Sequence, residues 1–225
     1  MPAGRLRPVA PARVRAPAPP AEAPRGRPGR AGTLQKSLPE RLAEVARARP
    51  EERVEVWFED EARFGQKGSL TTVWARRGTR PSAPKQTAYA NLHVLTAVCP
   101  GSGRAEGLVA PKLNAGVVQT FLDGLSATIP AGTHVLLIWD GAGYHVARRL
   151  RVPANLSVVT LPPYSPELNP VERLWLYLRS HCWSNRVYPD VEALEEAAVS
   201  GWRAVCLRPE KVRTICRCEY LTTGS

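Results

Sequence analysis

Residues 135–140 read Val-Leu-Leu-Ile-Trp-Asp, five consecutive apolar side chains followed by an acid. A run without polar alternation is typical of a central strand that is buried on both faces of a parallel sheet. In such sheets, ligands bind just beyond the carboxyl ends of the strands, where Asp140 stands. Gly141 and Gly143 follow and leave room for close approach of a ligand. We therefore predict a layered α/β fold with Asp140 as a candidate site residue; an ordinary Asp-Gly turn is the alternative.

A second acid belongs to a strand upstream. Residues 54–61 read Val-Glu-Val-Trp-Phe-Glu-Asp-Glu, the alternation of a half-buried strand, and we expect this strand to end near Asp60. Asp60 has the parity of the apolar residues Val54, Val56 and Phe58, so its carboxylate lies on the face that helices must cover. A buried charge there requires a metal or a cationic partner. Glu61 points to the opposite face and is the nearest competitor, because the ends of predicted strands vary by a residue or two.

The third acid lies in residues 161–175, which read Leu-Pro-Pro-Tyr-Ser-Pro-Glu-Leu-Asn-Pro-Val-Glu-Arg-Leu-Trp. Asn169 precedes Pro170 and is therefore pushed to extended geometry, where it can cap a helix whose first residue is Pro170. Glu172 then stands at the third helical position, where a glutamate closes a capping box. That local role is the structural alternative to a functional one.

Glu172 also flanks the buried stripe of the same helix, at about 100° to one side. From that position its carboxylate can reach the strand ends that carry Asp60 and Asp140. Glu167, in the preceding loop, is the alternative acid and is expected to serve the turn. The buried stripe consists of Val171, Leu174, Trp175 and Leu178.

These blocks resemble the insertion-sequence transposases of the mariner superfamily, bacterial insertion sequence 630 branch, which carry a DDE catalytic domain. The resemblance runs from about Lys36 to about Arg217. It rests on residues 58–65 (Phe-Glu-Asp-Glu-Ala-Arg-Phe-Gly), 139–145 (Trp-Asp-Gly-Ala-Gly-Tyr-His) and 161–175. It implies a ribonuclease-H-like fold, with a mixed central sheet flanked by helices.

The resemblance also implies the chemistry. Asp60, Asp140 and Glu172 would be the catalytic residues and the metal ligands, with two Mg²⁺ ions or Mn²⁺ as their substitute. The reaction would be cleavage of a DNA phosphodiester followed by strand transfer of the 3′ hydroxyl. The partners would be double-stranded DNA, as transposon ends and target, and a second copy in a homodimer. His145 stays outside this catalytic set.

Two other functions remain open from the sequence. One is a ribonuclease-H-like nuclease that does not transpose. The other is a non-catalytic DNA-binding remnant of a transposase, because family members carry a helix-turn-helix domain upstream, where this chain has a low-complexity segment. Seven basic residues are candidates for phosphate contacts, although a solvated surface charge is the simpler interpretation of each. They are Lys67, Arg76, Arg77, Lys85, Arg148, Arg149 and Arg151.

Most of the basic excess lies near the amino terminus. The formal net charge is +11, of which +8 falls in residues 1–50. Pro, Ala, Arg and Gly make up 27 of the first 33 residues, a composition that buries too little apolar surface to fold. We therefore expect a disordered tail over residues 1–33 and a catalytic domain over residues 34–225. A basic arm lying along a phosphate backbone is the functional alternative to a solvated tail.

The remaining pattern predicts strands and helices in an α/β order. A helix is expected from near Ser37 to Pro50, and Asn114 is expected to cap a helix that runs to about Ala127. Further strands are expected at 71–76, 88–98, 104–110 and 157–160, and helices at 170–183, 190–206 and 209–216.

Composition also indicates the compartment. No apolar run approaches 18 residues and the amino terminus lacks the apolar stretch of a signal peptide, so neither a membrane span nor secretion is expected. The five cysteines form no CxxC pair, and their odd number favours a reducing compartment. We expect a cytoplasmic protein.

Overall fold

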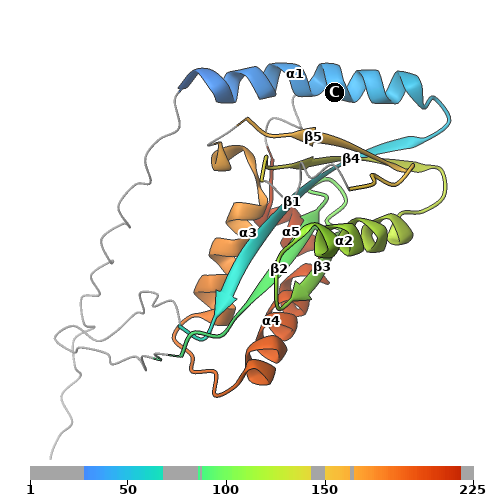
Figure 1. The fold of residues 1–225 in the computed structure, drawn as a ribbon. Coiled ribbons are helices and arrows are strands. Elements are labelled where there is room, and N and C mark those ends of the chain that lie inside the picture. Colours follow the sequence, from blue (N-terminus) through green and yellow to red (C-terminus); the bar gives the residue numbers. More distant parts are fainter. Residues whose placement is uncertain (1–27, 68–85, 87, 143–149, 163–164, 219–225) are drawn as a thin grey trace, which may run out of the picture.

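The computed structural model describes residues 28–67, 86, 88–142, 150–162 and 165–218 (Figure 1). The expected strand at 71–76, residues 1–27 of the predicted tail and His145 lie outside these ranges. So do five of the seven basic candidates for phosphate contacts.

Five strands of the described chain form one mixed sheet: β1 (Arg53–Gly65), β2 (Asn91–Val98), β3 (Ala105–Ala110), β4 (Thr133–Trp139) and β5 (Leu156–Thr160). Their order is β3-β2-β1-β4-β5. β1 is antiparallel to β2, and β2 to β3, whereas β1, β4 and β5 are parallel. The predicted mixed sheet is confirmed, and the fully apolar run lies in β4 between two neighbours.

Helices cover both faces of this sheet (Figure 1). α2 (Ala115–Thr128) packs on one face. α3 (Val171–Leu178), α4 (Val191–Cys206) and α5 (Pro209–Ile215) pack on the other, where α1 (Pro28–Ala48) also joins the core. Within the described residues, no helix has both the length and the hydropathy of a membrane span.

Strand parity divides the core between the two faces. On β4, Leu136 and Ile138 belong to the cluster beneath α3, α4 and α5, whereas Val135, Leu137 and Trp139 belong to the cluster beneath α2. All five side chains are almost completely buried. Burial on both faces explains why residues 135–139 of this strand carry no polar side chain before Asp140.

β1 is longer than the sequence predicted. Its parallel pairing with β4 stops at Phe58, opposite Ile138, but its antiparallel pairing with β2 continues from Phe58 to Gly65. The expectation that this strand ends near Asp60 is therefore wrong. Three consecutive acids, residues 59–61, interrupt the apolar alternation, whereas the backbone of β2 keeps the chain extended beyond them.

Two helices differ from expectation at their ends. α1 begins at Pro28 and includes residues 28–33, which the sequence placed in the disordered segment. That first part of the helix has no apolar periodicity, which is the signal that sequence patterns detect. The helix expected over 170–183 is divided, because α3 ends at Leu178 and the chain continues as a π-helix, η2 (Arg179–Trp183).

The amino terminus of α2 confirms the predicted cap. The Asn114 side chain accepts hydrogen bonds from the backbone N–H of Gly116 at 2.9 Å and of Val117 at 3.1 Å. Two otherwise unsatisfied donors of the first turn are thereby paired. Further along the helix, Gly124 is exposed, and a Cβ atom added there would meet no atom within 4 Å.

We predict opposite effects of two substitutions in α2. Asn114→Ala removes the cap and should lower the free energy of unfolding by about 1 kcal/mol. Gly124→Ala should raise it by about 0.5–1 kcal/mol, because alanine restricts the unfolded chain and meets no neighbour in the folded one. Urea unfolding measures both. A Gly124→Ala variant less stable than the parent would contradict the packing described for α2.

Candidate active site

The register of the sheet brings Asp60 and Asp140 together. Phe58 of β1 is paired with Ile138 of β4, and the two strands are parallel. Asp60 follows Phe58 by two residues, and Asp140 follows Ile138 by two residues. Asp140 lies just after β4, where its Oδ1 atom accepts a hydrogen bond from the backbone N–H of Ala142 at 2.9 Å. Asp60 lies inside β1, at the point where β4 no longer runs beside it. The two carboxylates therefore meet at one edge of the sheet.

Glu61 joins the two aspartates in an acidic cluster. One carboxylate oxygen of each of the three residues lies within 4.8 Å of the other two, which is the spacing of groups that share a cation. The sequence assigned Glu61 to the opposite face of the strand. In the described residues, the pairing of β4 with β1 stops at Phe58, so no β4 residue is paired with β1 beside Glu61. The Glu61 carboxylate can therefore approach the two aspartates although its strand parity differs from that of Asp60.

Trp175 orients Asp60. Its indole Nε1–H donates to the Asp60 Oδ2 atom at 2.9 Å, from a side chain that is only 1% exposed. Trp175 lies on the buried face of α3, so the hydrogen bond connects the acidic cluster to the core. The sequence predicted Trp175 as an apolar stripe residue, and periodicity does not reveal where an indole N–H points.

Asn169 fixes the start of α3 against β1. Its Oδ1 atom accepts from the backbone N–H of Val171 at 3.1 Å, and its Nδ2 atom donates to the backbone oxygen of Glu59 at 2.8 Å. The prediction of Asn169 as the cap and Pro170 as the first helical residue is wrong by one position, because the helix begins at Val171 and Pro170 takes the cap position with helical backbone angles. The Asn169 side chain nevertheless pairs the first backbone N–H of the helix. The second bond attaches the helix one residue before Asp60.

Glu172 does not close a capping box. The backbone N–H of Asn169, which a capping-box glutamate would accept from, donates instead to the Pro166 oxygen at 2.9 Å. The Glu172 side chain is on the exposed side of α3 and is not one of the three residues of the acidic cluster, although its charge acts on Asp60. Burial and the Asp140 charge raise the pKa of Glu172, while the Arg179 guanidinium lowers it.

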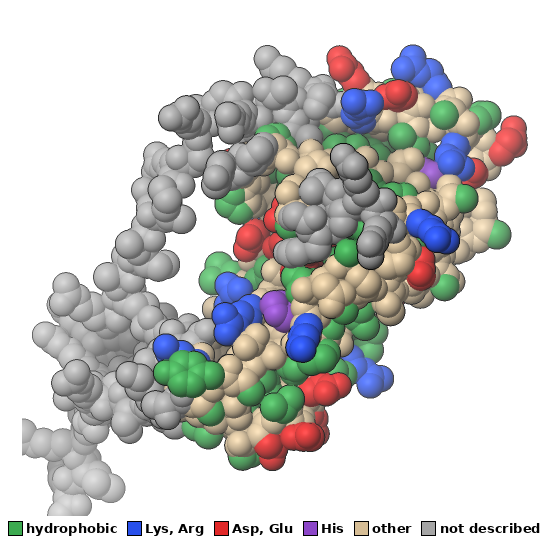
Figure 2. All heavy atoms as spheres, viewed as in Figure 1, with side chains coloured by type: hydrophobic (Ala, Val, Ile, Leu, Met, Phe, Trp, Pro, Cys, Tyr) green, Lys and Arg blue, Asp and Glu red, His purple; other side chains and the backbone are tan. Residues whose placement is uncertain are grey.

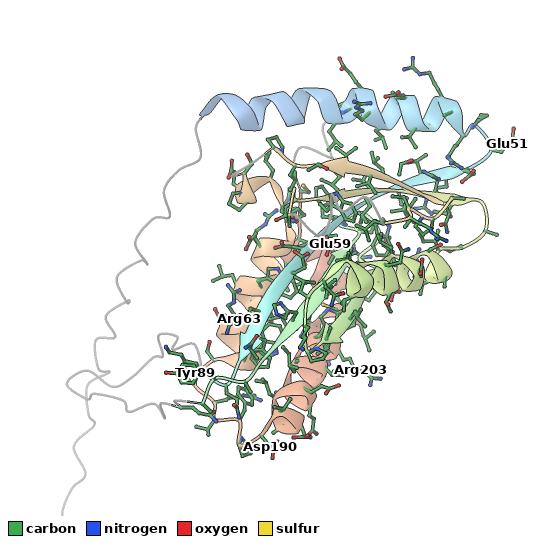
Figure 3. All side chains as sticks on the ribbon, in the orientation of Figure 1. Glu51, Glu59, Arg63, Tyr89, Asp190 and Arg203 are labelled. Carbon is green, nitrogen blue, oxygen red and sulfur yellow. The ribbon has the colours of Figure 1, made fainter. Side chains whose placement is uncertain are left out.

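The carboxylates raise one another's pKa values. Burial, followed by the charge of Glu172, raises the pKa of Asp60 to about 7, against the lowering effect of the Trp175 hydrogen bond. Burial also raises the pKa of Glu59, which lies on β1 near the centre of the sheet (Figure 3), and the charges of Glu61, Asp60 and Asp140 add to this. This concentration of negative charge is stabilised by protons or by a cation. Its donors are all oxygens, which suit a hard divalent ion.

Residues 55–195, which include β4, α3 and all of β1 except its first two residues, match the family model of the DDE superfamily endonucleases. The match covers more than half of the chain, and the chain belongs to this family.

Two curated relatives have similar sequences. Protein y4pE/y4sA of Sinorhizobium fredii (strain NBRC 101917 / NGR234), described as uncharacterized, is 37% identical over 123 residues, which cover 55% of this chain and 91% of that protein. The transposable element Tc3 transposase of Caenorhabditis elegans is 33% identical over 70 residues, which cover 29% of this chain and 21% of that transposase.

Solved structures of the Mos1 mariner transposase show the same fold. Its catalytic domain is 15% identical, with a TM-score of 0.53, and the match covers 87% of this chain and 91% of that domain. The Mos1 paired end complex with Mn is 16% identical, with a TM-score of 0.58, and the match covers 93% of this chain and 67% of that one. The predicted ribonuclease-H-like fold and the resemblance to mariner-type transposases are confirmed.

We predict that the metal-free protein loses stability as pH rises from about 4 to about 7. The pKa of Asp60 is about 7 in the folded state and about 3.9 in an unfolded chain, so the folded state binds more protons between these values. The stability gained by protonation is therefore lost as pH rises through 7. Thermal unfolding in EDTA should show a flatter pH dependence for Asp60→Asn than for the parent. Parallel curves for the two proteins would contradict the raised pKa.

Proposed function

We propose that this chain is a DDE transposase that cleaves DNA phosphodiester bonds in a metal-dependent reaction and transfers the resulting 3′ hydroxyl to target DNA. The observation that carries this proposal is the meeting of Asp60 and Asp140 at the edge of the sheet, with Glu172 on the helix fixed beside them. This arrangement suits phosphoryl transfer, which depends on positioned oxygen ligands for cations rather than on a protein nucleophile.

Asp60, Asp140 and Glu172 are the proposed metal ligands. Asp60 and Asp140 fit Mg²⁺, or Mn²⁺ in its place, because with Glu61 they offer three carboxylate oxygens within 4.8 Å of one another. Glu172 lies outside that group, and its charge acts on Asp60. Two ions bound there would supply Lewis-acid stabilisation of the charge that develops on the phosphodiester. Glu61 is close enough to act as a further ligand.

The surrounding residues have defined parts in this proposal. The Trp175 indole holds one oxygen of Asp60 and favours the ionised form of the carboxyl. Asn169 keeps α3, and with it Glu172, at a fixed height along β1. Both act on the ligands and are positioning residues, because ligand geometry depends on such outer contacts.

The relatives support DNA as the partner. One relative is a transposase of a transposable element, and Mos1 structures include a paired-end complex with the left transposon end and a strand transfer complex. The match covers 61% of the Mos1 chain in the strand transfer complex. Double-stranded transposon ends and target DNA are therefore the proposed substrates of this chain. A homodimer stays a prediction.

Substitution of the proposed ligands tests the function. Asp60→Asn, Asp140→Asn and Glu172→Gln should each reduce Mg²⁺-dependent nicking of duplex DNA to background while the fold is retained. Glu167→Gln is the control, because this exposed acid precedes α3 in the η1 turn (Pro166–Leu168) and has no part in the proposed ligand set.

The products separate the alternatives. Joined strands in addition to nicks identify a transposase, and nicks alone identify a nuclease. Wild-type protein that binds DNA but does not cleave it with Mg²⁺ or Mn²⁺ would indicate a non-catalytic remnant. A Glu172→Gln variant that cleaves normally would remove Glu172 from the ligand set.

A second prediction concerns Trp175. Trp175→Phe keeps most of the buried ring but removes the donor to Asp60, so Mn²⁺ affinity measured by calorimetry should fall about 10–100-fold. Trp202→Phe is the matched control, because it removes an indole hydrogen bond of the same length, 2.9 Å, to Thr96 on β2. Equal Mn²⁺ affinity of the two variants would mean that the Trp175 bond is only structural.

A further inference from the structure

A basic pocket lies at the far end of β1, beyond the acidic cluster. It has a volume of about 340 Å³ and combines three cationic side chains with an exposed aromatic ring. Figure 2 shows Lys and Arg side chains gathered on this face below the acidic ones, and Figure 3 shows Arg63 and Tyr89 near the same end of the sheet. The side chains that matter here are Arg63, Lys67, Tyr89 and Arg179.

The floor of the basic pocket is closely packed. The Phe64 ring packs against Trp183, with ring centroids 4.7 Å apart, and against Tyr188, with centroids 5.3 Å apart. All three rings are buried. Gln66, 5% exposed, donates from Nε2 to the Tyr188 backbone oxygen at 2.8 Å and from its backbone N–H to Ala90 at 2.9 Å. A ligand would therefore meet a preformed surface, which lowers the entropy cost of ordering the pocket side chains on binding.

Tyr89 is placed as a stacking platform. Its side chain is 74% exposed, and the Lys67 Nζ atom lies 5.5 Å from the centre of its ring. The backbone oxygen of Tyr89 accepts from Asn91 Nδ2 at 3.2 Å, which restrains the chain at this point. An exposed aromatic ring beside cations is the arrangement that binds single-stranded nucleic acid, with the base on the ring and the phosphates on the cations.

The basic pocket lies further along the same strand as the acidic cluster. Both lie along β1, and Arg63 is three residues beyond Asp60, or about 10 Å at the rise of a strand. That distance corresponds to roughly three nucleotides of duplex rise. Arg179 follows α3 and is the cation whose charge acts on Glu172. A DNA strand whose phosphodiester lies at the acidic cluster would therefore extend to the pocket.

We propose that the basic pocket binds one unpaired nucleotide of the DNA strand close to the cleaved bond, with its base stacked on Tyr89 and its phosphates on Arg63, Lys67 and Arg179. This inference rests on the proposed function for the choice of DNA as ligand. The volume of the pocket is at the lower end of the range for ligand pockets and suits one nucleotide rather than a paired segment. The pocket thus selects DNA whose strands are opened beside the cleavage site.

Binding of single-stranded DNA without metal tests the pocket separately from catalysis. Anisotropy of a short fluorescein-labelled oligothymidylate in EDTA should show about tenfold or greater loss of affinity for Tyr89→Ala, and near-parent affinity for Tyr89→Phe. Arg63→Ala and Arg179→Ala should each weaken binding and lower the salt slope by about one. Arg203→Ala is the matched control, because it removes an exposed charge from α4 (Figure 3) and should change only the non-specific background.

Photocrosslinking locates the base. Oligonucleotides with 5-iodouracil at successive positions should crosslink to Tyr89 at one position, and free thymidine monophosphate or inorganic phosphate should compete only weakly. Strong competition by phosphate alone would replace the nucleotide site with a simple anion site and overturn the proposal. Equal affinity of Tyr89→Ala, Arg63→Ala and Arg203→Ala would overturn it as well.

The outcome is independent of the catalytic proposal. Asp140→Asn protein should still crosslink through Tyr89, because the acidic cluster is not part of the pocket. If the parent protein crosslinks at Tyr89 but never nicks DNA, the pocket stands and the proposed catalysis fails. If the parent nicks DNA while the Tyr89 and Arg63 variants bind like the parent, the pocket proposal fails and catalysis stands.

Discussion

The parallel pairing of β1 with β4 stops at Phe58 while β1 itself runs on to Gly65. The other features of the site depend on this difference in length. Because of it, Asp140 lies at the end of β4 and Asp60 lies beside it in the middle of β1. Glu61 also comes close to both aspartates there. Had both strands ended together, the aspartates would still be neighbours, but the chain beyond them would not form a straight support for a longer ligand.

The acidic cluster is energetically unfavourable by itself, and contacts with the core hold it in place. Carboxylates in close proximity repel one another, and burial adds to the cost of ionising them. Two hydrogen bonds hold α3 against β1 and stabilise this arrangement. Trp175 donates to the Asp60 carboxylate, and Asn169 donates to the backbone oxygen of Glu59 on β1. Sites that are destabilised in isolation and held by the rest of the fold are typical of functional centres.

Much of this arrangement could be predicted from sequence, since it depends on periodicity and on cap chemistry. The apolar run before Asp140, the parity of Asp60 and, to within one position, the cap of α3 at Asn169 were all readable in this way. The continuation of β1 was not, because its partner strand lies some thirty residues away and supplies backbone bonds that no local pattern encodes. The indole bond of Trp175 was missed for a similar reason, since a buried ring has the same periodicity whether or not its N–H is used. The metal-binding roles of Asp60, Asp140 and Glu172 stay predictions.

The burial of α3 also bears on how the site moves. Val171, Leu174, Trp175 and Leu178 are each at most 1% exposed, so local opening of the helix that carries Glu172 would expose its whole apolar face. Backbone amides in such an element exchange with solvent only when the whole domain unfolds. Glu172 can therefore move mainly by changing its side-chain rotamer, because its backbone is held in the helix. A shift of Glu172 relative to β1 would require the buried face of α3 to separate from the core, so the packing of this helix limits how far the carboxylate can move.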